Sequence, residues 1–545
     1  MGFDSRLGLC GVVFVTVILH SRVFALGMKT PPRILALELG STAAGRGVVE
    51  ELRRLIPGIW IAGVEKQSQY RETAFDEVIT TQGDAFLGRY ESVDTASLAM
   101  TPELSSLMAP FEGKILNLLG LAAVRPSSDY PNPIRGVPTY QDSYESRKDL
   151  FNRHCCFWNY VLDHYRIDAV LHENLGQEGY DYVALQVARA KGIPTLVFNI
   201  TGQLPRVLFV QEDEFGVGNL NLGSRLKKLI GSDIKHEDPR FIRRSMSSIM
   251  KSPDAGLRSE GKVSEYKTSP IWSWLFDRSI YRNKIDSVSI VGIVFGKLLR
   301  VIRQPRRSIK TFARTQELVR DTRRSQREEC KYAVQPKLDG NYIYFPLHFQ
   351  PETSSSIKAK NFYRLREAVA FLADSLPKDW TLVVKEHPHQ FRRLLKREPG
   401  FYAQIAAISR VQLVRHTEDN EQIVRSARAI ACVSHSSITA HAAFKGTPVI
   451  SLGESHFREA PGYFCIGSTL DLRDVIELVK NNQFKSNSHD FDEFIRKLEE
   501  STFEGEFGDQ FEDVSDEDWA RSTTATRHNI SRVICEWLRL RGLII

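Results

Sequence analysis

The chain has 545 residues, of which 42% are hydrophobic, so it can bury a sizeable core and is expected to form two domains with appended segments. Its 73 basic and 66 acidic residues give a net charge of +7, which is only mildly basic. The seven cysteines are scattered without the spacing of metal ligands, which argues against a structural metal site and against a disulfide-stabilised secreted protein.

Residues 1–27 are apolar from Leu7 to Leu19 and then polar at His20, Ser21 and Arg22. A membrane-spanning helix needs about 20 apolar residues, and this run is shorter. Three interpretations stay open: a signal peptide, a membrane anchor, or a start set upstream of the true one. The third arises because the sequence from Met28 leads directly into a strand-forming run.

Residues 28–218 show the alternation of strand and helix patterns that is typical of a Rossmann-like domain. We expect this domain to bind the acceptor, the molecule that receives the transferred group. A strand at 34–39 precedes a glycine-bearing loop at 40–47, which either approaches a phosphate or a sugar or is a tight turn. The other expected elements are helices at 98–124, 143–165 and 180–190 and strands at 167–172 and 195–199.

Glu173 directly follows the strand at 167–172, in a polar loop. A carboxylate at the carboxyl end of a strand can take the proton of an acceptor hydroxyl as a general base. The alternative is that Glu173 caps the helix that follows. Glu173 is the catalytic candidate of this half of the chain.

Residues 219–335 form a basic, partly helical insertion. Between Lys297 and Arg327 there are eleven basic residues against two acidic ones, and an apolar run at 288–301 lies just ahead. Such a segment at 288–327 fits either the surface of an anionic membrane or a helical linker with a solvated basic face. Nucleic acid fits poorly, because aromatic residues do not interleave the basic ones.

Residues 336–482 are expected to form a second Rossmann-like domain that binds a nucleotide sugar. Residues 483–545 are expected to be an acidic, solvated loop over 499–519 and a terminal helix over 521–541. The expected strands of the second domain are 341–347, 381–388, 411–416, 429–433 and 447–453, and its helices are 361–375, 391–408, 420–427, 438–446 and 468–480.

Polar side chains follow three of these strands, at Lys385 to Pro388, Ser434 to Ser437 and Gly453 to His456. In parallel sheets, ligands lie at the carboxyl ends of the strands, where helix N-termini favour anions. We therefore expect a phosphate of an activated sugar to bind there. Glu352, which follows the strand at 341–347, is a further catalytic candidate.

Four stretches resemble the bacterial capsule polysaccharide biosynthesis family, which is similar to the Kdo-transferring capsule enzymes and shares a His-Pro element with bacterial sialyl- and polysialyltransferases. The resemblance covers residues 341–453 well and extends more loosely to residues 168–198. The stretches are FPLHFQPE (345–352), VKEHP (384–388), VSHSS (433–437) and KGTPVISLG (445–453). This resemblance implies an α/β, GT-B-like fold, with two Rossmann-like domains facing a cleft, a basic helical insertion and a C-terminal helix.

The resemblance also implies roles for single residues. His387 would contact the nucleotide phosphate and stabilise the leaving group, and Ser436 and Ser437 would donate hydrogen bonds to the same phosphate. Lys385 would add positive charge there.

Ser434 and His435 complete the polar loop that the resemblance assigns to phosphate binding. His441 stands where the family usually carries a glutamate that holds the ribose, and an imidazole offers one donor or acceptor in place of two oxygens. This departure puts the identity of the donor, and activity itself, in question.

The function implied is a glycosyltransferase of surface polysaccharide biosynthesis, acting at the cytoplasmic face of the inner membrane. It would move a sugar from a nucleotide donor, such as CMP-Kdo, to a lipid-linked or polysaccharide acceptor without a cofactor. It would also act without a metal, because no DxD-like motif stands out in the expected site loops. Two alternatives stay open: a non-catalytic polysaccharide assembly or binding protein with a decayed nucleotide site, and a GT-B-shaped sugar-nucleotide epimerase.

Overall fold

The computed structural model describes residues 30–39, 43–65, 73–90, 100–122, 143–173, 176, 179–201, 204–212, 220–235, 242–243, 305–350, 352–392, 395–484, 488–505 and 516–545. The apolar leader at 1–27, the apolar run at 288–301 and residues 506–515 of the acidic segment lie outside the described residues. No helix among the described residues is long and apolar enough to span a membrane.

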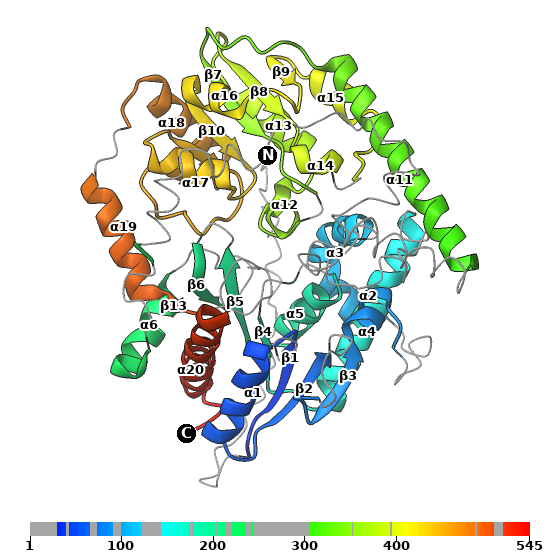
Figure 1. Ribbon diagram of the computed structural model, residues 1–545, viewed down its shortest axis with the longest axis vertical. Helices are drawn as coiled ribbons and strands as arrows, with labels where there is room; N and C mark the ends of the chain where they lie inside the picture. The colour runs from blue at the N-terminus through cyan, green and yellow to red at the C-terminus, as the bar shows by residue number, and fades with distance from the viewer. Residues whose placement is uncertain are drawn as a thin grey trace, which may run out of the picture.

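The first domain is built on a seven-stranded sheet with the order β13-β6-β5-β4-β1-β2-β3 (Figure 1). The strands from β5 to β3 are parallel, whereas β6 and β13 are antiparallel to their neighbours. The strands are β1 (Arg33–Leu37), β2 (Trp60–Glu65), β3 (Glu77–Thr81), β4 (Ala169–His172), β5 (Thr195–Thr201), β6 (Leu204–Gln211) and β13 (Phe503–Glu504).

Helices cover both faces of this sheet, which explains why β1 and β4 are apolar except for Arg33 at the start of β1 and His172 at the end of β4. On one face, α3, α4 and α5 pack with Trp158 and Tyr180 in the core. On the other, α1 packs against the C-terminal helix α20, with Leu52 and Trp537 buried between them. These helices are α1 (Ala43–Leu55), α2 (Gln82–Leu87), α3 (Pro102–Ala122), α4 (Tyr144–His164), α5 (Tyr180–Ala190), α6 (Asn221–Ile230) and α20 (Asp516–Leu540).

The second domain has a six-stranded parallel sheet with the order β12-β11-β10-β7-β8-β9. Its strands are β7 (Tyr342–Pro346), β8 (Thr381–Lys385), β9 (Val411–Val414), β10 (Ala429–Cys432), β11 (Val449–Ser451) and β12 (Tyr463–Cys465). The helices that follow the first domain in the chain are α11 (Pro305–Tyr332), α12 (Thr353–Ser356), α13 (Leu365–Ser375), α14 (Pro388–Arg392), α15 (Phe401–Ala406), α16 (Asn420–Ser426), α17 (Ser437–Phe444), α18 (Thr469–Lys480) and α19 (Ser488–Ser501).

The architecture confirms the expected α/β fold with two Rossmann-like domains, a basic helix within the insertion and a C-terminal helix that returns to the first domain. In each sheet the strand order reverses once, between β1 and β4 in the first and between β7 and β10 in the second. Open parallel sheets bind ligands at such switch points, outside the carboxyl ends of the strands. We therefore expect a ligand position at the carboxyl edge of each sheet, next to the point where the strand order reverses.

The helix expected at 391–408 is wrong, because the structure divides this stretch into α14 and α15. Pro399 and Gly400 interrupt the helix, since proline lacks the donor that a helix needs and Gly400 adopts a φ of +83°. The intervening loop carries Arg397 into the protein interior.

The solvated loop expected at 499–519 is also wrong for its described part. Phe503 and Glu504 form the edge strand β13 against β6 and are buried, and α19 packs on α6. Helix α20 begins at Asp516, inside the stretch expected to be loop. The strand is only two residues long, which is too short for an alternation of apolar and polar residues to predict it from the sequence.

A buried ion pair joins the loops at the carboxyl edge of the second sheet. Glu386 accepts two hydrogen bonds from Arg397, Nε to Oε2 at 2.8 Å and Nη2 to Oε1 at 2.8 Å, and a third from the Tyr402 hydroxyl at 2.8 Å. Arg397 also donates to the His348 carbonyl at 2.9 Å and to the Gln350 amide oxygen at 2.6 Å. The pair thus fixes the loops after β7 and β8 relative to each other.

We expect Arg397→Leu to lower the free energy of unfolding by about 3–5 kcal/mol, because it leaves the Glu386 charge buried without its partner. Urea denaturation followed by circular dichroism measures the change. Arg364→Leu is the control, since Arg364 belongs to an exposed ion pair with Glu367 whose loss costs less than about 1 kcal/mol. Equal losses in the two variants would contradict the role assigned to the buried pair.

Candidate functional site

Four histidines stand in a row along the carboxyl edge of the second sheet. His456, His435, His348 and His387 follow β11, β10, β7 and β8, which are four adjacent strands. The rings of His435 and His456 are 4.8 Å apart at an angle of 60°, and the His387 ring lies 5.8 Å from Phe349. His348 and His435 flank the point at which the strand order reverses.

Lys358 brings the first domain into contact with this row. Its Nζ donates to Asn199 Oδ1 on β5 at 3.3 Å and is hydrogen-bonded to His456 Nε2 at 3.1 Å. Phe209 on β6 places its ring 4.6 Å from the His456 ring. Since Asn199 and Phe209 belong to the first domain, this site lies where the two domains meet.

The residues on either side of Lys358 pack into different domains. Ile357 packs into the core of the first domain, whereas Ala359 packs into the core of the second. Gly453 allows this approach, because an added Cβ would lie 2.2 Å from the carbonyl oxygens of Lys358 and Val433. The next residue, Glu454, donates its backbone N–H to the Lys358 carbonyl at 2.8 Å.

Burial disfavours the charged forms of these groups. It lowers the pKa of Lys358 to about 7, with the charge of Glu352 opposing the shift. It lowers the pKa of His348 to about 4 and, together with the neighbouring Lys358, holds the pKa values of His435 and His456 well below their usual range. An anion at this site would reverse the shift of Lys358, because it stabilises the protonated amine.

Several buried polar atoms of His456, His435 and nearby serines have no hydrogen-bond partner within the described part of the chain. Lys358 Nζ and His456 Nε2 share a hydrogen bond whose direction follows the imidazole tautomer, and His456 Nδ1 has no partner among the described residues. Buried donors without acceptors are costly, and the oxygens of a phosphate would satisfy several of them at once. The unpaired atoms are His456 Nδ1, His435 Nδ1, Ser434 Oγ and Ser356 Oγ. We call Lys358, His435, His456, Ser434 and Ser356 the junction cluster.

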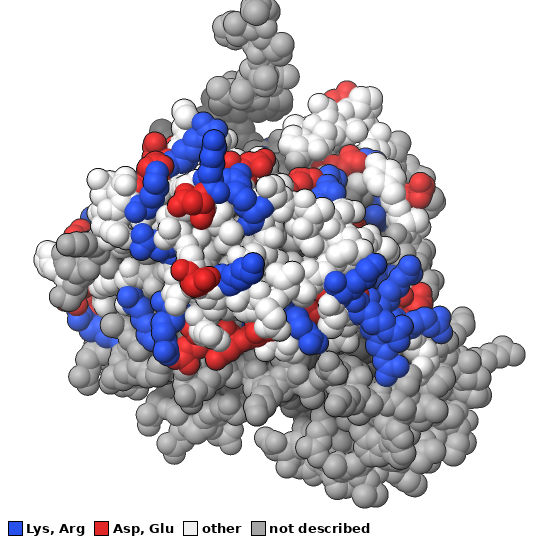
Figure 2. Space-filling view, turned by 90° about the horizontal axis from the view of Figure 1, so that it is seen from above, with Lys and Arg blue, Asp and Glu red and all other residues white. Residues whose placement is uncertain are grey.

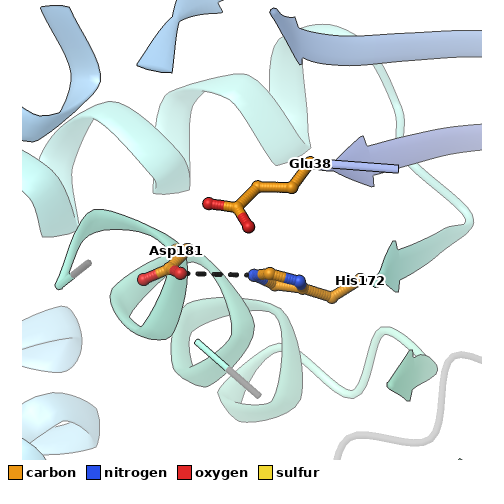
Figure 3. A group of neighbouring side chains, drawn as sticks. All are labelled: Glu38, His172 and Asp181. Carbon is orange, nitrogen blue, oxygen red and sulfur yellow. Dashed lines mark hydrogen bonds and ion pairs between the residues drawn. The ribbon is translucent and has the colours of Figure 1, made fainter. Parts of the chain in front are cut away.

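A second cluster lies at the switch point of the first sheet. Glu38 follows β1, His172 ends β4, and Asp181 lies in the first turn of α5 (Figure 3). His172 Nε2 and Asp181 Oδ2 are 3.4 Å apart, and all three side chains are buried. One ligand atom from each residue lies within 4.8 Å of the other two. We call these three residues the carboxylate–histidine cluster.

The structure places three of the predicted site residues in or beside the junction cluster. His435 and Ser434 belong to it. Glu352 is exposed and accepts a hydrogen bond from the Ser354 hydroxyl at 2.5 Å. Its negative charge raises the pKa of Lys358, against the effect of burial. The polar loop after β10 is therefore at the junction, as the phosphate hypothesis requires.

Other predicted residues have different surroundings. Lys385 is buried and donates to Asn420 Oδ1 at 2.5 Å. Ser436 is the N-cap of α17 and accepts from the Thr439 N–H at 3.2 Å, whereas Ser437 is exposed in the first turn. His441 is buried within α17. Lys385 and Ser436 thus have structural roles that the sequence left open.

His387 and the Ser436 hydroxyl lie at the ends of β8 and β10, which β7 separates. Strands pack about 4.8 Å apart, so about 10 Å divides these two strand ends. The contact of His387 with a phosphate therefore stays a prediction. Glu173, the candidate base, follows His172 and is buried, so it lies beside the carboxylate–histidine cluster.

Sequence reasoning did not select Lys358, Glu38, His172, Asp181 or His456 as site residues. His456 belongs to the polar stretch that follows the expected strand at 447–453, and His172 is the last residue of the expected strand at 167–172, so a polar residue at a strand end is the signal that finds both. Lys358 had no such signal, because it follows the four-residue helix α12 and is brought to the site only by domain packing.

Comparison with known proteins finds no family model and no curated protein that matches this chain. Among solved structures, the UDP-GlcNAc 2-epimerase from Neisseria meningitidis bound to UDP-GlcNAc is 12% identical, covering 93% of this chain and 100% of that chain, with a TM-score of 0.20. The UDP-GlcNAc 2-epimerase from Methanocaldococcus jannaschii is 12% identical, with coverages of 86% and 99% and a TM-score of 0.23.

The calicheamicin glycosyltransferase is also 12% identical, with coverages of 93% and 98% and a TM-score of 0.20. None of these scores supports a conclusion about activity, which rests on the residues of the site. The resemblance of residues 341–453 to the capsule family stays a prediction.

We expect Lys358→Met to remove a pH dependence of stability that the wild-type protein has. The pKa of this lysine is 10.5 when exposed and about 7 in the folded protein, so the unfolded state binds more protons between these values. The wild-type free energy of unfolding should therefore rise with pH from about 7 upwards relative to that of the variant. Urea denaturation of both proteins across this range measures the difference, and parallel curves would contradict the burial of an ionisable lysine.

Proposed function

We propose that this protein is a glycosyltransferase that uses a nucleotide sugar and binds the donor phosphate at the junction cluster. The observation that carries this proposal is the position of Lys358, buried between the two domains and bonded to His456. A buried amine beside unpaired donors, next to the switch point of a parallel sheet, is suited to an anion.

In the proposed reaction an acceptor hydroxyl attacks the anomeric carbon of the donor sugar. The bond from that carbon to the phosphate oxygen breaks, and the nucleotide leaves with the electron pair. The Lys358 ammonium and the imidazole N–H of His456 would stabilise the charge that develops on the leaving phosphate. Glu173, on the opposite domain, would take the proton of the acceptor hydroxyl.

The finer assignments rest on the resemblance of residues 341–453. The donor we propose is CMP-linked, such as CMP-Kdo, and the acceptor is a lipid-linked or growing surface polysaccharide. Lys358 and the buried donors would supply at the phosphate the positive charge that a metal ion supplies in other transferases. His387 would extend the contact along the carboxyl edge.

Binding of a nucleotide sugar should weaken as the pH rises through about 7, because the pKa of Lys358 is about 7 and its charged form binds the phosphate. We expect Lys358→Met to weaken binding by about 10-fold or more, since a hydrogen bond to a charged group contributes about 1.5–3 kcal/mol. Lys358→Arg should keep binding and lose the pH dependence. Calorimetry with CMP-, UDP- and GDP-linked sugars, followed by transfer assays, measures both effects.

Lys445→Met is the matched control, because Lys445 is an exposed lysine at the end of α17. A wild-type protein that binds none of the three nucleotide classes would contradict the proposal and favour an assembly protein. Binding followed by epimerisation without an acceptor would favour the epimerase alternative.

The insertion helix α11 presents a basic stripe. Figure 2 shows a group of basic side chains on this side of the molecule. Four exposed basic residues recur at helical spacing: Arg320, Arg324, Arg327 and Lys331. On the other side of α11, Thr322, Ser325 and Glu329 are buried. We propose that this stripe binds an anionic lipid surface, where a lipid-linked acceptor would be found.

Changing Arg320, Arg324 and Arg327 together to Gln should reduce binding to anionic vesicles more than 100-fold, at about 1 kcal/mol for each charge. Co-sedimentation with phosphatidylglycerol vesicles measures this loss, and phosphatidylcholine vesicles should bind neither protein. The same changes at Arg364, Arg425 and Arg496 provide a charge-matched control away from α11. Equal losses in the two triple variants would show that net charge, and not the stripe, drives binding.

A further inference from the structure

The carboxylate–histidine cluster has the composition and spacing of a metal-binding site. Figure 3 shows the carboxylates of Glu38 and Asp181 both turned toward the imidazole of His172. The three ligand atoms lie within 4.8 Å of one another. Two ligand atoms that are each about 2.1 Å from one ion at a tetrahedral angle lie about 3.4 Å apart.

The observed separation of His172 Nε2 and Asp181 Oδ2 is 3.4 Å. A well-formed N–H···O hydrogen bond is shorter, at about 2.7–3.2 Å. The spacing therefore fits two ligands of one ion better than it fits a direct hydrogen bond. The third ligand, Glu38, directly follows β1, the strand beside β4, so chain segments on both sides of the switch point supply the set.

Neutral donors orient the two carboxylates. Glu38 Oε1 accepts from Gln82 Nε2 at 2.9 Å and from the Tyr180 hydroxyl at 3.1 Å, and Asp181 Oδ1 accepts from the Tyr182 N–H at 2.7 Å. These three donors are uncharged and hold the carboxylates in place. Outer hydrogen bonds of this kind commonly orient the carboxylate ligands of metal ions.

Two buried carboxylates within this distance repel each other, and the repulsion is strong where water is excluded. Asp181 is fully buried and Glu38 is 8% exposed. A divalent cation between them would convert this repulsion into attraction. An imidazole nitrogen together with two carboxylate oxygens suits Zn²⁺ and Mn²⁺, whereas Mg²⁺ and Ca²⁺ prefer oxygen ligands alone.

We propose that Glu38, His172 and Asp181 bind one divalent first-row transition-metal ion, such as Zn²⁺ or Mn²⁺, at the switch point of the first sheet. Three protein ligands leave at least one position of the ion open. The ion would lie beside Glu173, which follows His172 directly in the chain. The site does not depend on the junction cluster or on the proposed transfer reaction.

The test uses the full-length protein, treated with a chelator and then titrated separately with Zn²⁺ and Mn²⁺. We expect one ion per chain by elemental analysis after gel filtration and a higher unfolding temperature with metal than without. Asp181→Asn and Glu38→Gln should each weaken metal binding by at least about 10-fold, and the pair should abolish stoichiometric binding.

Glu329→Gln is the matched control, because Glu329 is a buried carboxylate that pairs with His416 at 2.8 Å but belongs to no three-residue group among the described residues. It should keep one ion per chain. The wild-type protein bound to Co²⁺ supplies a readout that needs no variant, since visible absorption bands report nitrogen and oxygen ligands. A wild-type protein that retains no stoichiometric ion, or a double variant that retains it unchanged, would overturn the proposal.

Discussion

The ion pair of Glu386 and Arg397 is the interaction on which the carboxyl edge of the second sheet depends. Loops after parallel strands have no ladder partners of their own, so their backbone groups need other acceptors and donors. Arg397 meets this need by binding the His348 carbonyl, the Gln350 side chain and the Glu386 carboxylate at once. Its planar guanidinium can serve three acceptors in fixed directions, which a lysine ammonium cannot.

A second constraint is that Lys358 is buried where the domains meet. A desolvated amine costs stability, and its neighbours His435 and His456 add electrostatic repulsion whenever they are protonated. The chain nevertheless builds this arrangement with a glycine at position 453 that no larger residue could replace without moving two carbonyl groups. Burial of Lys358 lowers the free energy of unfolding of the unliganded protein. An anion that binds the folded protein at this site would raise it again.

Strand and helix patterns were sufficient to predict both Rossmann-like domains, because β1, β4, β7 and β10 are short apolar runs bounded by turns. The sequence could not show where the chain from 499 onwards packs, since β13 is two residues long and gains its stability only from pairing with β6. The same holds for the site. His435 was predicted because it follows a strand and precedes a helix, whereas Lys358 reaches the site only through packing between domains.

The two clusters show how one topological rule places groups of opposite charge. Each sheet reverses its strand order once, and the reversal leaves a position where the two loops diverge. In the second sheet that position is next to histidines and a lysine, which suit an anion. In the first it holds two carboxylates and one histidine, which suit a cation. Asn199, bonded to Lys358, lies on β5 beside β4, the strand that ends in His172. Neighbouring strands of a single sheet therefore carry one residue of the carboxylate–histidine cluster and one contact to the junction cluster. Packing between the domains thus sets the distance between Lys358 and the carboxylate–histidine cluster.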